Sequence, residues 1–198
     1  MIEIEKKFKL TSKELEQLIV EGTRLGEKQI TDTYYDNATY DLTRGDMWLR
    51  ERNGRFELKL PLGGKNGNVQ TYHELEDDDS IRKALNLSFD QPFAETLEAA
   101  GYSPFCTCKT TRTKYKIGEF GLDVDIADFG DFTYELAEIE LMAESKEDVP
   151  EAEAKILEFA KSHGLSTGEI RGKILEYLAR KNPEHFDALK KAWNAPNL

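Results

Sequence analysis

The 198-residue sequence is poor in cysteine and histidine and has no long hydrophobic run. Its two cysteines, Cys106 and Cys108, lie two residues apart, so on a strand they face the same side and are badly placed for a mutual disulfide. A lone C-x-C pair is also a weak metal-site signal, because no second Cys or His pair lies nearby. This cysteine usage favours a reducing compartment.

Long apolar segments and excess positive charge are both absent. No apolar run approaches the ~20 residues that a membrane-spanning helix needs, and the first ten residues, MIEIEKKFKL, alternate like a strand and not like a signal peptide. The net charge of −11, from 27 basic and 38 acidic residues, repels phosphate backbones and anionic lipids. We therefore expect a cytoplasmic protein that binds neither nucleic acid nor membranes, with a monomer as the default oligomeric state.

The chain has enough apolar residues for a packed core. Hydrophobic residues make up 39% of it and aromatic residues 10%. This length suits one domain and is short for two, so we expect a single domain over residues 1–198. The sequence shows no repeat and no Pro-rich linker, and GGKNGN at 63–68 is its most flexible-looking segment.

Strand patterns occur in two blocks, each followed by helical patterns. Asn53-Gly54 between two alternating segments is a strong signal for a two-residue hairpin turn, and Thr11 with Glu14 forms a capping box that opens a helix. Strands are expected over 2–9, 28–36, 47–52, 55–60, 69–76, 105–117, 120–128 and 133–143. Helices are expected from 11 to about 21, within 79–101, and roughly over 150–162, 168–181 and 183–193.

Alternate residues on these strands sort into one apolar and one charged face. The charged faces hold carboxylate pairs on four strands and basic pairs on two others: Glu3 with Glu5, Glu74 with Glu76, Asp123 with Asp125 and Glu138 with Glu140, then Arg50 with Arg52 and Arg112 with Lys114. An antiparallel sheet with one face in water explains the alternation. A closed barrel with a wet, charged interior also explains the pairing, because carboxylates hold Mg²⁺ or Mn²⁺ and Arg and Lys clamp a polyphosphate.

Short motifs along the chain carry a family resemblance. They are EIEKK at 3–7, DTYYD at 32–36, WLRER at 48–52, ELKLP at 57–61, YHEL at 72–75, TRT at 111–113, DVDIADFG at 123–130, EIE at 138–140 and GKILEYL at 172–178. In this order they resemble the CYTH superfamily of triphosphate tunnel metalloenzymes, and most of all its thiamine triphosphatase branch, over residues 1 to about 193. The resemblance implies an α+β fold: a closed eight-stranded antiparallel β-barrel, or tunnel, with helices packed outside.

The resemblance also implies roles for individual residues. The residues that resemble the ligands of the divalent metal, Mg²⁺ or Mn²⁺, are five carboxylates: Glu3, Glu5, Asp125, Glu138 and Glu140. The residues that resemble the triphosphate-binding group are six basic side chains: Lys7, Arg50, Arg52, Lys59, Arg112 and Lys173. Tyr34 and Lys59 resemble a catalytic dyad, Trp48 matches an aromatic that stacks on the thiamine rings, and Glu74 matches an acidic tunnel position whose role stays open.

Each assignment has a plainer alternative. Glu3 and Glu5 suit solvated strand positions, Trp48 suits a core, and Lys173 suits an exposed helix face. Lys109, Lys114 and Asp123 can line the same interior and receive no role. The three histidines, His73, His163 and His185, show no ligand spacing and are expected at the surface or its boundary.

The expected activity is metal-dependent hydrolysis of the terminal phosphate of a small-molecule triphosphate, with thiamine triphosphate as the favoured substrate because of Trp48 and the DTYYD motif. An inorganic triphosphatase or a class IV adenylyl cyclase on the same scaffold is the alternative enzyme. A non-catalytic polyphosphate-binding module is the alternative from another class, and the presence of both Tyr34 and Lys59 argues against it.

Overall fold

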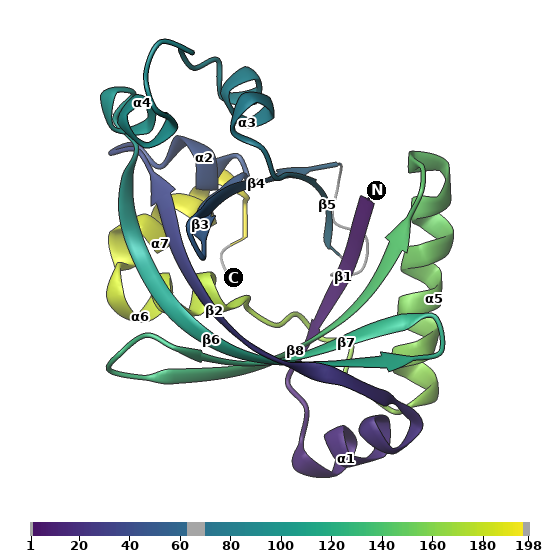
Figure 1. The fold of residues 1–198 in the computed structure, drawn as a ribbon. Helices are drawn as coiled ribbons and strands as arrows, with labels where there is room; N and C mark the ends of the chain where they lie inside the picture. Colours follow the sequence, from purple (N-terminus) through teal and green to yellow (C-terminus); the bar gives the residue numbers. More distant parts are fainter. Residues whose placement is uncertain (1, 63–69, 196–198) are drawn as a thin grey trace. The chain divides into compact units, whose positions relative to one another are not determined.

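A computed structural model describes residues 2–62 and 70–195, shown as a ribbon in Figure 1. Its eight strands are β1 (Ile2–Phe8), β2 (Thr23–Asp36), β3 (Trp48–Arg52), β4 (Arg55–Pro61), β5 (Gln70–Leu75), β6 (Ser103–Ile117), β7 (Phe120–Asp128) and β8 (Thr133–Ala143). Seven α-helices and one 3₁₀ turn complete the described residues: α1 (Ser12–Glu21), α2 (Asp41–Arg44), α3 (Asp78–Leu85), α4 (Phe93–Ala99), η1 (Lys146–Asp148), α5 (Val149–Ser162), α6 (Lys173–Lys181) and α7 (Pro183–Ala192).

The strands form a closed antiparallel barrel in the order β1-β5-β4-β3-β2-β6-β7-β8, which confirms the expected fold. The first strand pairs with the last along its whole length, from Ile2 opposite Ala143 to Phe8 opposite Ala137. Asn53 and Gly54 form the predicted hairpin turn between β3 and β4, and both have the positive φ, 49° and 83°, that a type I′ turn requires.

The chain divides into two compact units. The first comprises Met1–Ile30, Leu62–His73 and Lys109–Lys173, and the second comprises Thr31–Pro61, Glu74–Cys108 and Ile174–Leu198. Strands β2, β5 and β6 contribute residues to both units. The expectation of a single domain therefore stays a prediction.

The core of the first unit lies between helices α1 and α5 and the apolar faces of β1, β7 and β8. Ile4 and Phe8 of β1 and Ile139 of β8 are buried with Ile156 of α5 and Leu18 of α1. Helix α5 runs beside β8 in Figure 1. The apolar half of each alternating strand thus faces the helices, and the charged half faces away from them.

The second unit has its own core, where α2, α3 and α4 cover the apolar faces of β3 and β4. Leu49 and Leu58 are buried with Ile81, Phe93 and Leu97. The stretch predicted helical over 79–101 is two helices, because Asn86 ends α3 in the left-handed conformation and Pro92 precedes α4.

Buried Arg82 organises the loop between α3 and α4. Its guanidinium donates to the carbonyl oxygens of Ser88 and Gln91, the latter at 2.7 Å, and to Thr96 Oγ1 at 2.9 Å. The guanidinium thus provides hydrogen-bond donors to loop carbonyl oxygens that a continuous helix would have paired with its own backbone N–H groups.

Other element boundaries also differ from expectation. Strand β2 begins at Thr23 and not at 28, and the predicted helix over 168–181 begins only at Lys173. The short helix α2 was not predicted. Val69, the predicted first residue of β5, and the loop 63–68 lie outside the described residues. Among those residues, no helix is both long enough and apolar enough to cross a membrane.

Candidate active site

Two charged groups form on the strand faces opposite the two cores. The group in the first unit, which we call the acidic cluster, comprises Glu5, Lys7, Arg112, Lys114, Asp123, Asp125, Glu138, Glu140 and Lys173. The group in the second unit, which we call the arginine cluster, comprises Asp32, Arg50, Arg52, Glu57, Lys59 and Glu74. Every predicted phosphate-binding residue lies in one of the two.

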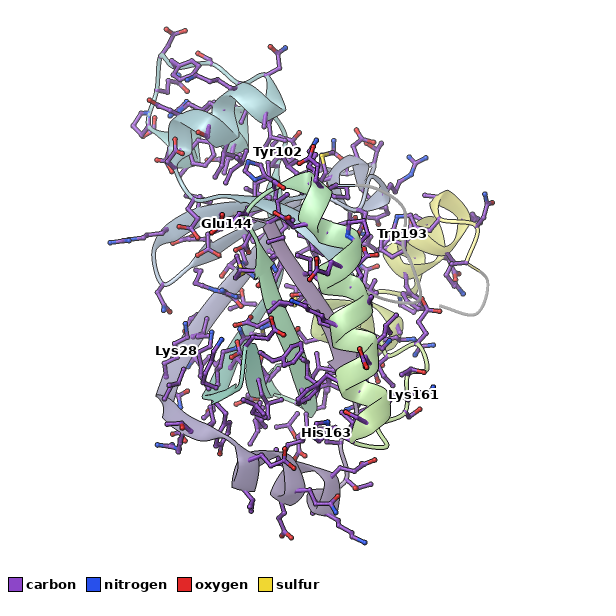
Figure 2. The ribbon with its side chains drawn as sticks, turned by 90° about the vertical axis from the view of Figure 1, so that its right-hand side faces the viewer. Lys28, Tyr102, Glu144, Lys161, His163 and Trp193 are labelled. Carbon is purple, nitrogen blue, oxygen red and sulfur yellow. The ribbon has the colours of Figure 1, made fainter. Side chains whose placement is uncertain are left out.

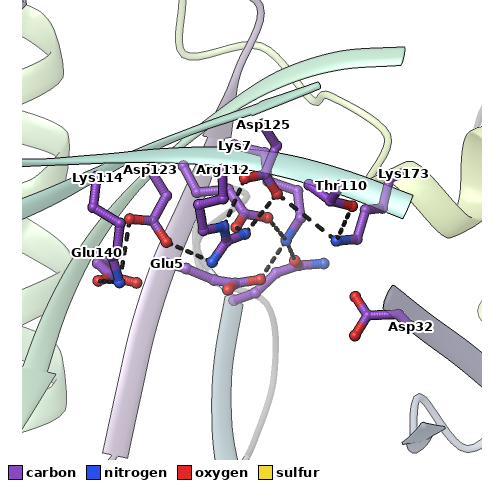
Figure 3. Close-up of polar contacts among 12 residues, drawn as sticks. Glu5, Lys7, Asp32, Thr110, Arg112, Lys114, Asp123, Asp125, Glu140 and Lys173 are labelled. Carbon is purple, nitrogen blue, oxygen red and sulfur yellow. Dashed lines mark hydrogen bonds and ion pairs between the residues drawn. The ribbon is translucent and has the colours of Figure 1, made fainter. Parts of the chain in front are cut away.

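Arg112 of β6 is the centre of the acidic cluster (Figure 3). It lies directly opposite Asp125 of β7 and donates to both of its oxygens, each at 2.6 Å. It also donates to Asp123 and, at 2.8 Å, to Glu138. Burial disfavours the charge on Arg112, but the carboxylates, Glu138 foremost, outweigh burial and raise its pKa above the ordinary value.

Two lysines link the rest of the acidic cluster. Lys7 of β1 contacts Glu5 and Gln70 and lies 3.7 Å from Glu138, its cross-strand partner on β8. Lys173, at the start of α6, lies 3.7 Å from an oxygen of Asp125 and donates to Thr110 at 3.3 Å. Lys173 is buried, so the alternative that it lies on an exposed helix face is wrong.

The surroundings of Glu138 on balance favour its ionised form. Burial and the charge of Glu5 disfavour its ionised form, but Arg112 and Lys7 outweigh them and lower its pKa. An ionised carboxylate is the form that binds a cation, and in this structure the cations beside Glu138 are Arg112 and Lys7.

Asp123 and Lys114, which the sequence left without roles, also belong to the acidic cluster. Lys114 lies 3.3 Å from an oxygen of each of Asp123 and Glu140. Asp123 is fully buried, and burial raises its pKa to about 6 although Arg112 pulls it down. Gly121 lies opposite Glu140, and a Cβ at this position would come within 2.7 Å of the Glu140 side chain. Because residue 121 has no side chain, the Glu140 side chain has room to lie across it.

The arginine cluster follows from the registers of β2, β3 and β4. Asp32 lies opposite Arg52, Tyr34 lies opposite Arg50, and Arg50 lies opposite Glu57. Arg52 donates to both oxygens of fully buried Asp32, at 2.7 and 3.0 Å. This bidentate geometry is the strong form of an arginine–carboxylate pair.

The remaining ion pairs of the arginine cluster join Glu57 and Glu74 to the cations. Arg50 Nη2 lies 2.6 Å from Glu57 and 3.2 Å from Glu74, and Lys59 Nζ lies 3.3 Å from Glu74. Burial disfavours the charge on Arg50, but Tyr34, Asp32 and the two glutamates raise its pKa. The sequence did not identify Asp32 or Glu57 as site residues, because only the strand register shows which carboxylate meets which arginine.

Trp48 lies on the same β3 face as Arg50 and is half-buried. Its indole N–H donates to Asp46 at 3.0 Å, and its ring meets the edge of Trp193 with a centroid distance of 6.3 Å. The Trp193 N–H donates to the carbonyl oxygen of Arg44. Trp193 was missed from the sequence, where it appeared only as the end of the last predicted helix.

The expectation that His185 lies at the surface or its boundary is wrong. His185 of α7 is fully buried, stacks on Tyr40 at 3.9 Å, and lies 2.7 Å from the Thr43 hydroxyl, which donates to Asp36. Burial lowers its pKa to about 4. Asp36, the last residue of the DTYYD motif, accepts from the backbone N–H groups of Leu42 and Thr43, so it holds α2 in place.

The other two histidines lie where the sequence suggested. His73 is exposed. His163, labelled in Figure 2, follows the last residue of α5 and is partly exposed. Its Nε2 lies 3.3 Å from Glu21. Cys106 and Cys108 are both buried and lie on the same face of β6.

Four of the five predicted metal ligands belong to the acidic cluster, and the fifth, Glu3, lies beside it on β1. Glu5, Asp125, Glu138 and Glu140 belong to the cluster, and Glu3 shares the face of Glu5. Within residues 2–62 and 70–195, no three His, Cys, Asp or Glu side chains are grouped as a metal site. The donor chemistry nevertheless fits Mg²⁺ or Mn²⁺, because the cluster sets five carboxylates against four cations and all its acidic donors are hard oxygens.

A model of the CYTH domain matches residues 1–172. The chain belongs to the CYTH family. Proteins of this family bind triphosphate substrates, and its tunnel enzymes generally use divalent metal ions. The family assignment agrees with the barrel and with the charged strand faces described above.

Solved CYTH-like structures share the fold at low sequence identity. A protein of Pyrococcus horikoshii OT3 is 21% identical, with a TM-score of 0.65, over 90% of this chain and 99% of its own. A Vibrio parahaemolyticus protein, provisionally described as an adenylate cyclase, is 21% identical, with a TM-score of 0.56, over 90% and 98%. A Hippeastrum protein, provisionally described as an adenylyl cyclase and said to have a dominant triphosphatase activity, is 18% identical, with a TM-score of 0.56, over 93% and 98%.

Proposed function

We propose that this CYTH protein is a metal-dependent hydrolase that removes the terminal phosphate of a triphosphate, and that its substrate is thiamine triphosphate. The observation that carries the proposal is the arginine cluster. Arg50, Arg52 and Lys59 project from adjacent strands into one ion-paired group, which is the arrangement that binds successive phosphate groups of a chain.

The basic residues supply binding and charge stabilisation. Phosphoryl transfer depends on alignment and on stabilising charge at the phosphate oxygens, which guanidinium and ammonium groups provide. We assign this role to Arg50, Arg52 and Lys59 in the second unit, and to Lys7, Arg112 and Lys173 in the first. All six are at least partly buried, so their charges are less screened than at an exposed surface.

The carboxylates of the first unit would hold the metal. Glu3, Glu5, Glu138 and Glu140 are the proposed ligands, with Asp125 beside them, although Arg112 already engages both oxygens of Asp125. A bound divalent ion supplies charge neutralisation on the phosphate and a more acidic water. The lowered pKa of Glu138, which favours its ionised form, supports this assignment.

Tyr34 with Lys59 is proposed to accept the proton of the attacking water. Tyr34 is buried and lies directly opposite Arg50, whose positive charge stabilises negative charge on the phenolic oxygen. Lys59 lies on the strand on the other side of β3, opposite Trp48. The dyad therefore flanks the strand that carries both arginines.

Trp48 supports an organic triphosphate over an inorganic one. Its half-buried indole beside Arg50 is placed to stack on a cationic ring, and thiamine carries such a ring. The triphosphatase activity described for the Hippeastrum protein supports hydrolysis. The description of the Vibrio protein makes adenylate cyclisation the competing activity.

Phosphate release from thiamine triphosphate, tripolyphosphate and ATP, each with Mg²⁺ and with Mn²⁺, tests the proposal. We expect the catalytic efficiency for thiamine triphosphate to exceed the other two by more than about tenfold. Efficiencies within tenfold of one another would remove the thiamine assignment. Formation of cyclic AMP from ATP without phosphate release would replace hydrolysis by cyclisation, and Lys59→Ala serves as the inactive control.

A further inference from the structure

Glu57 of β4 lies between the two arginines of β3. Its Oε2 accepts from Arg50 Nε at 2.7 Å, lies 2.6 Å from Arg50 Nη2, and lies 3.7 Å from Arg52 Nη1. Because Arg50 and Arg52 are two residues apart on one strand, both guanidiniums point to the same side. A single carboxylate oxygen thus faces both.

This position leaves one end of each guanidinium for a ligand. Arg50 gives its Nε and Nη2 to carboxylates, and Arg52 gives its Nε and Nη2 to Asp32. Within the described residues, Nη1 of each arginine donates no hydrogen bond, and Arg52 Nη1 has only the longer ion-pair contact of 3.7 Å with Glu57. Asp32 and Glu57 together fix the planes of the two guanidiniums and so determine where their remaining N–H groups point.

The charge of Glu57 has two opposed effects. Arg50 and Arg52 repel each other, and the positive charge of Arg50 disfavours the charge of Arg52. A carboxylate between them offsets this repulsion. The arginine cluster contains three acidic and three basic groups, so its formal charge is zero, and Glu57 repels any phosphate that the arginines bind.

We propose that Glu57 is a positioning residue for the two arginines and that it also weakens phosphate binding, so that the site holds a polyphosphate in a defined geometry but with moderate affinity. The positioning part rests on the proposed hydrolase function. The affinity part does not, because it concerns anion binding alone. Weaker binding also speeds the release of the diphosphate and phosphate products, which carry the same charged groups as the substrate.

The decisive variant is Glu57→Gln, which keeps the size and an acceptor oxygen but removes the charge. Calorimetric titration with tripolyphosphate, in chelator and without added metal, measures binding in the absence of turnover. We expect Glu57→Gln to bind tripolyphosphate about tenfold or more tightly than the natural protein. With metal and substrate, we expect KM to fall and kcat to fall at least about fivefold.

Two further variants separate charge from geometry. Glu57→Asp keeps the charge and shortens the side chain, so binding should stay within about threefold while kcat falls. Glu51→Gln is the matched control, because Glu51 lies on the opposite face of β3, where it accepts from Tyr35 at 3.0 Å. It should leave both binding and kcat unchanged.

Each outcome decides the proposal. Binding that is unchanged or weaker in Glu57→Gln overturns the affinity part, and full kcat in Glu57→Asp overturns the positioning part. If Glu57→Gln fails to fold, Glu57→Asp still tests positioning, and a Glu57→Asp protein with tighter binding overturns the charge argument. Failure of the natural protein to hydrolyse any triphosphate refutes the proposed function, whereas the calorimetric result still decides the affinity part.

Discussion

Arg52→Ala should destabilise the protein as well as inactivate it, and the two effects can be separated. Arg52 holds fully buried Asp32 through two hydrogen bonds, so truncation leaves a buried carboxylate without its arginine. Removing one partner of a buried pair costs about 3–5 kcal/mol, and losing a charged phosphate contact costs about 1.5–3 kcal/mol of transition-state stabilisation. The latter corresponds to a loss of roughly 10- to 150-fold in kcat/KM.

The double variant Arg52→Ala with Asp32→Asn distinguishes the two effects. Neutralising Asp32 removes the buried charge that has lost its arginine, so more than half of the lost free energy of unfolding should return. Activity should not return, because the phosphate contact is still missing. Urea unfolding and phosphate release on the same preparations measure both quantities.

A matched arginine provides the control for this experiment. Arg55 lies opposite Arg52 in the register of β3 and β4 but is exposed, so Arg55→Ala should change the free energy of unfolding by less than about 0.5 kcal/mol. The reasoning is refuted if Arg52→Ala unfolds at the same urea concentration as the natural protein. It is equally refuted if the double variant regains activity along with stability.

Three further predictions concern the metal, the substrate and pH. A chelator should abolish phosphate release and Mg²⁺ or Mn²⁺ should restore it, with Glu138→Gln lowering activity more than about tenfold; full activity in a metal-free assay contradicts this. Trp48→Ala should raise KM for thiamine triphosphate several-fold and leave tripolyphosphate hydrolysis nearly unchanged, whereas equal losses on both substrates would make Trp48 a packing residue. The pKa of His185 falls from 6.5 to about 4 on folding, so only the unfolded chain takes up this proton between those values, and the contribution of His185 to the free energy of unfolding should drop by about 3 kcal/mol as pH decreases through that window. Asp123, whose pKa is raised to about 6, acts with the opposite sign over nearly the same pH range, so the His185 effect is the pH-dependent difference between urea unfolding of the natural protein and of His185→Gln from pH 7 to 4.

The strand faces were predictable because the period of a strand is fixed by its backbone. Alternation alone places Arg50 with Arg52, and Glu138 with Glu140, on the face away from the helices, and the structure confirms both. The ion-pair partners were not predictable in this way. The pairing of Asp32 with Arg52 depends on the register between β2 and β3, which no local pattern specifies.

The errors have a common physical origin in contacts between distant segments. His185 is buried because α7 packs on α2 and places the ring against Tyr40 and Thr43, more than 140 residues earlier in the chain. The predicted helical stretch is divided into α3 and α4, and Arg82 bonds to the loop between them. Helical periodicity carries no information about either contact.

The pairing of the first strand with the last also determines when the acidic cluster can form. Lys7 and Glu138 lie opposite each other although they are 131 positions apart in the chain, so their contact closes a very long loop. Contacts of such sequence separation form late and slow the folding of β-rich proteins. During synthesis, the glutamates of β1 therefore leave the ribosome long before β8 exists to receive them, and the acidic cluster can be completed only after the last strand has been made.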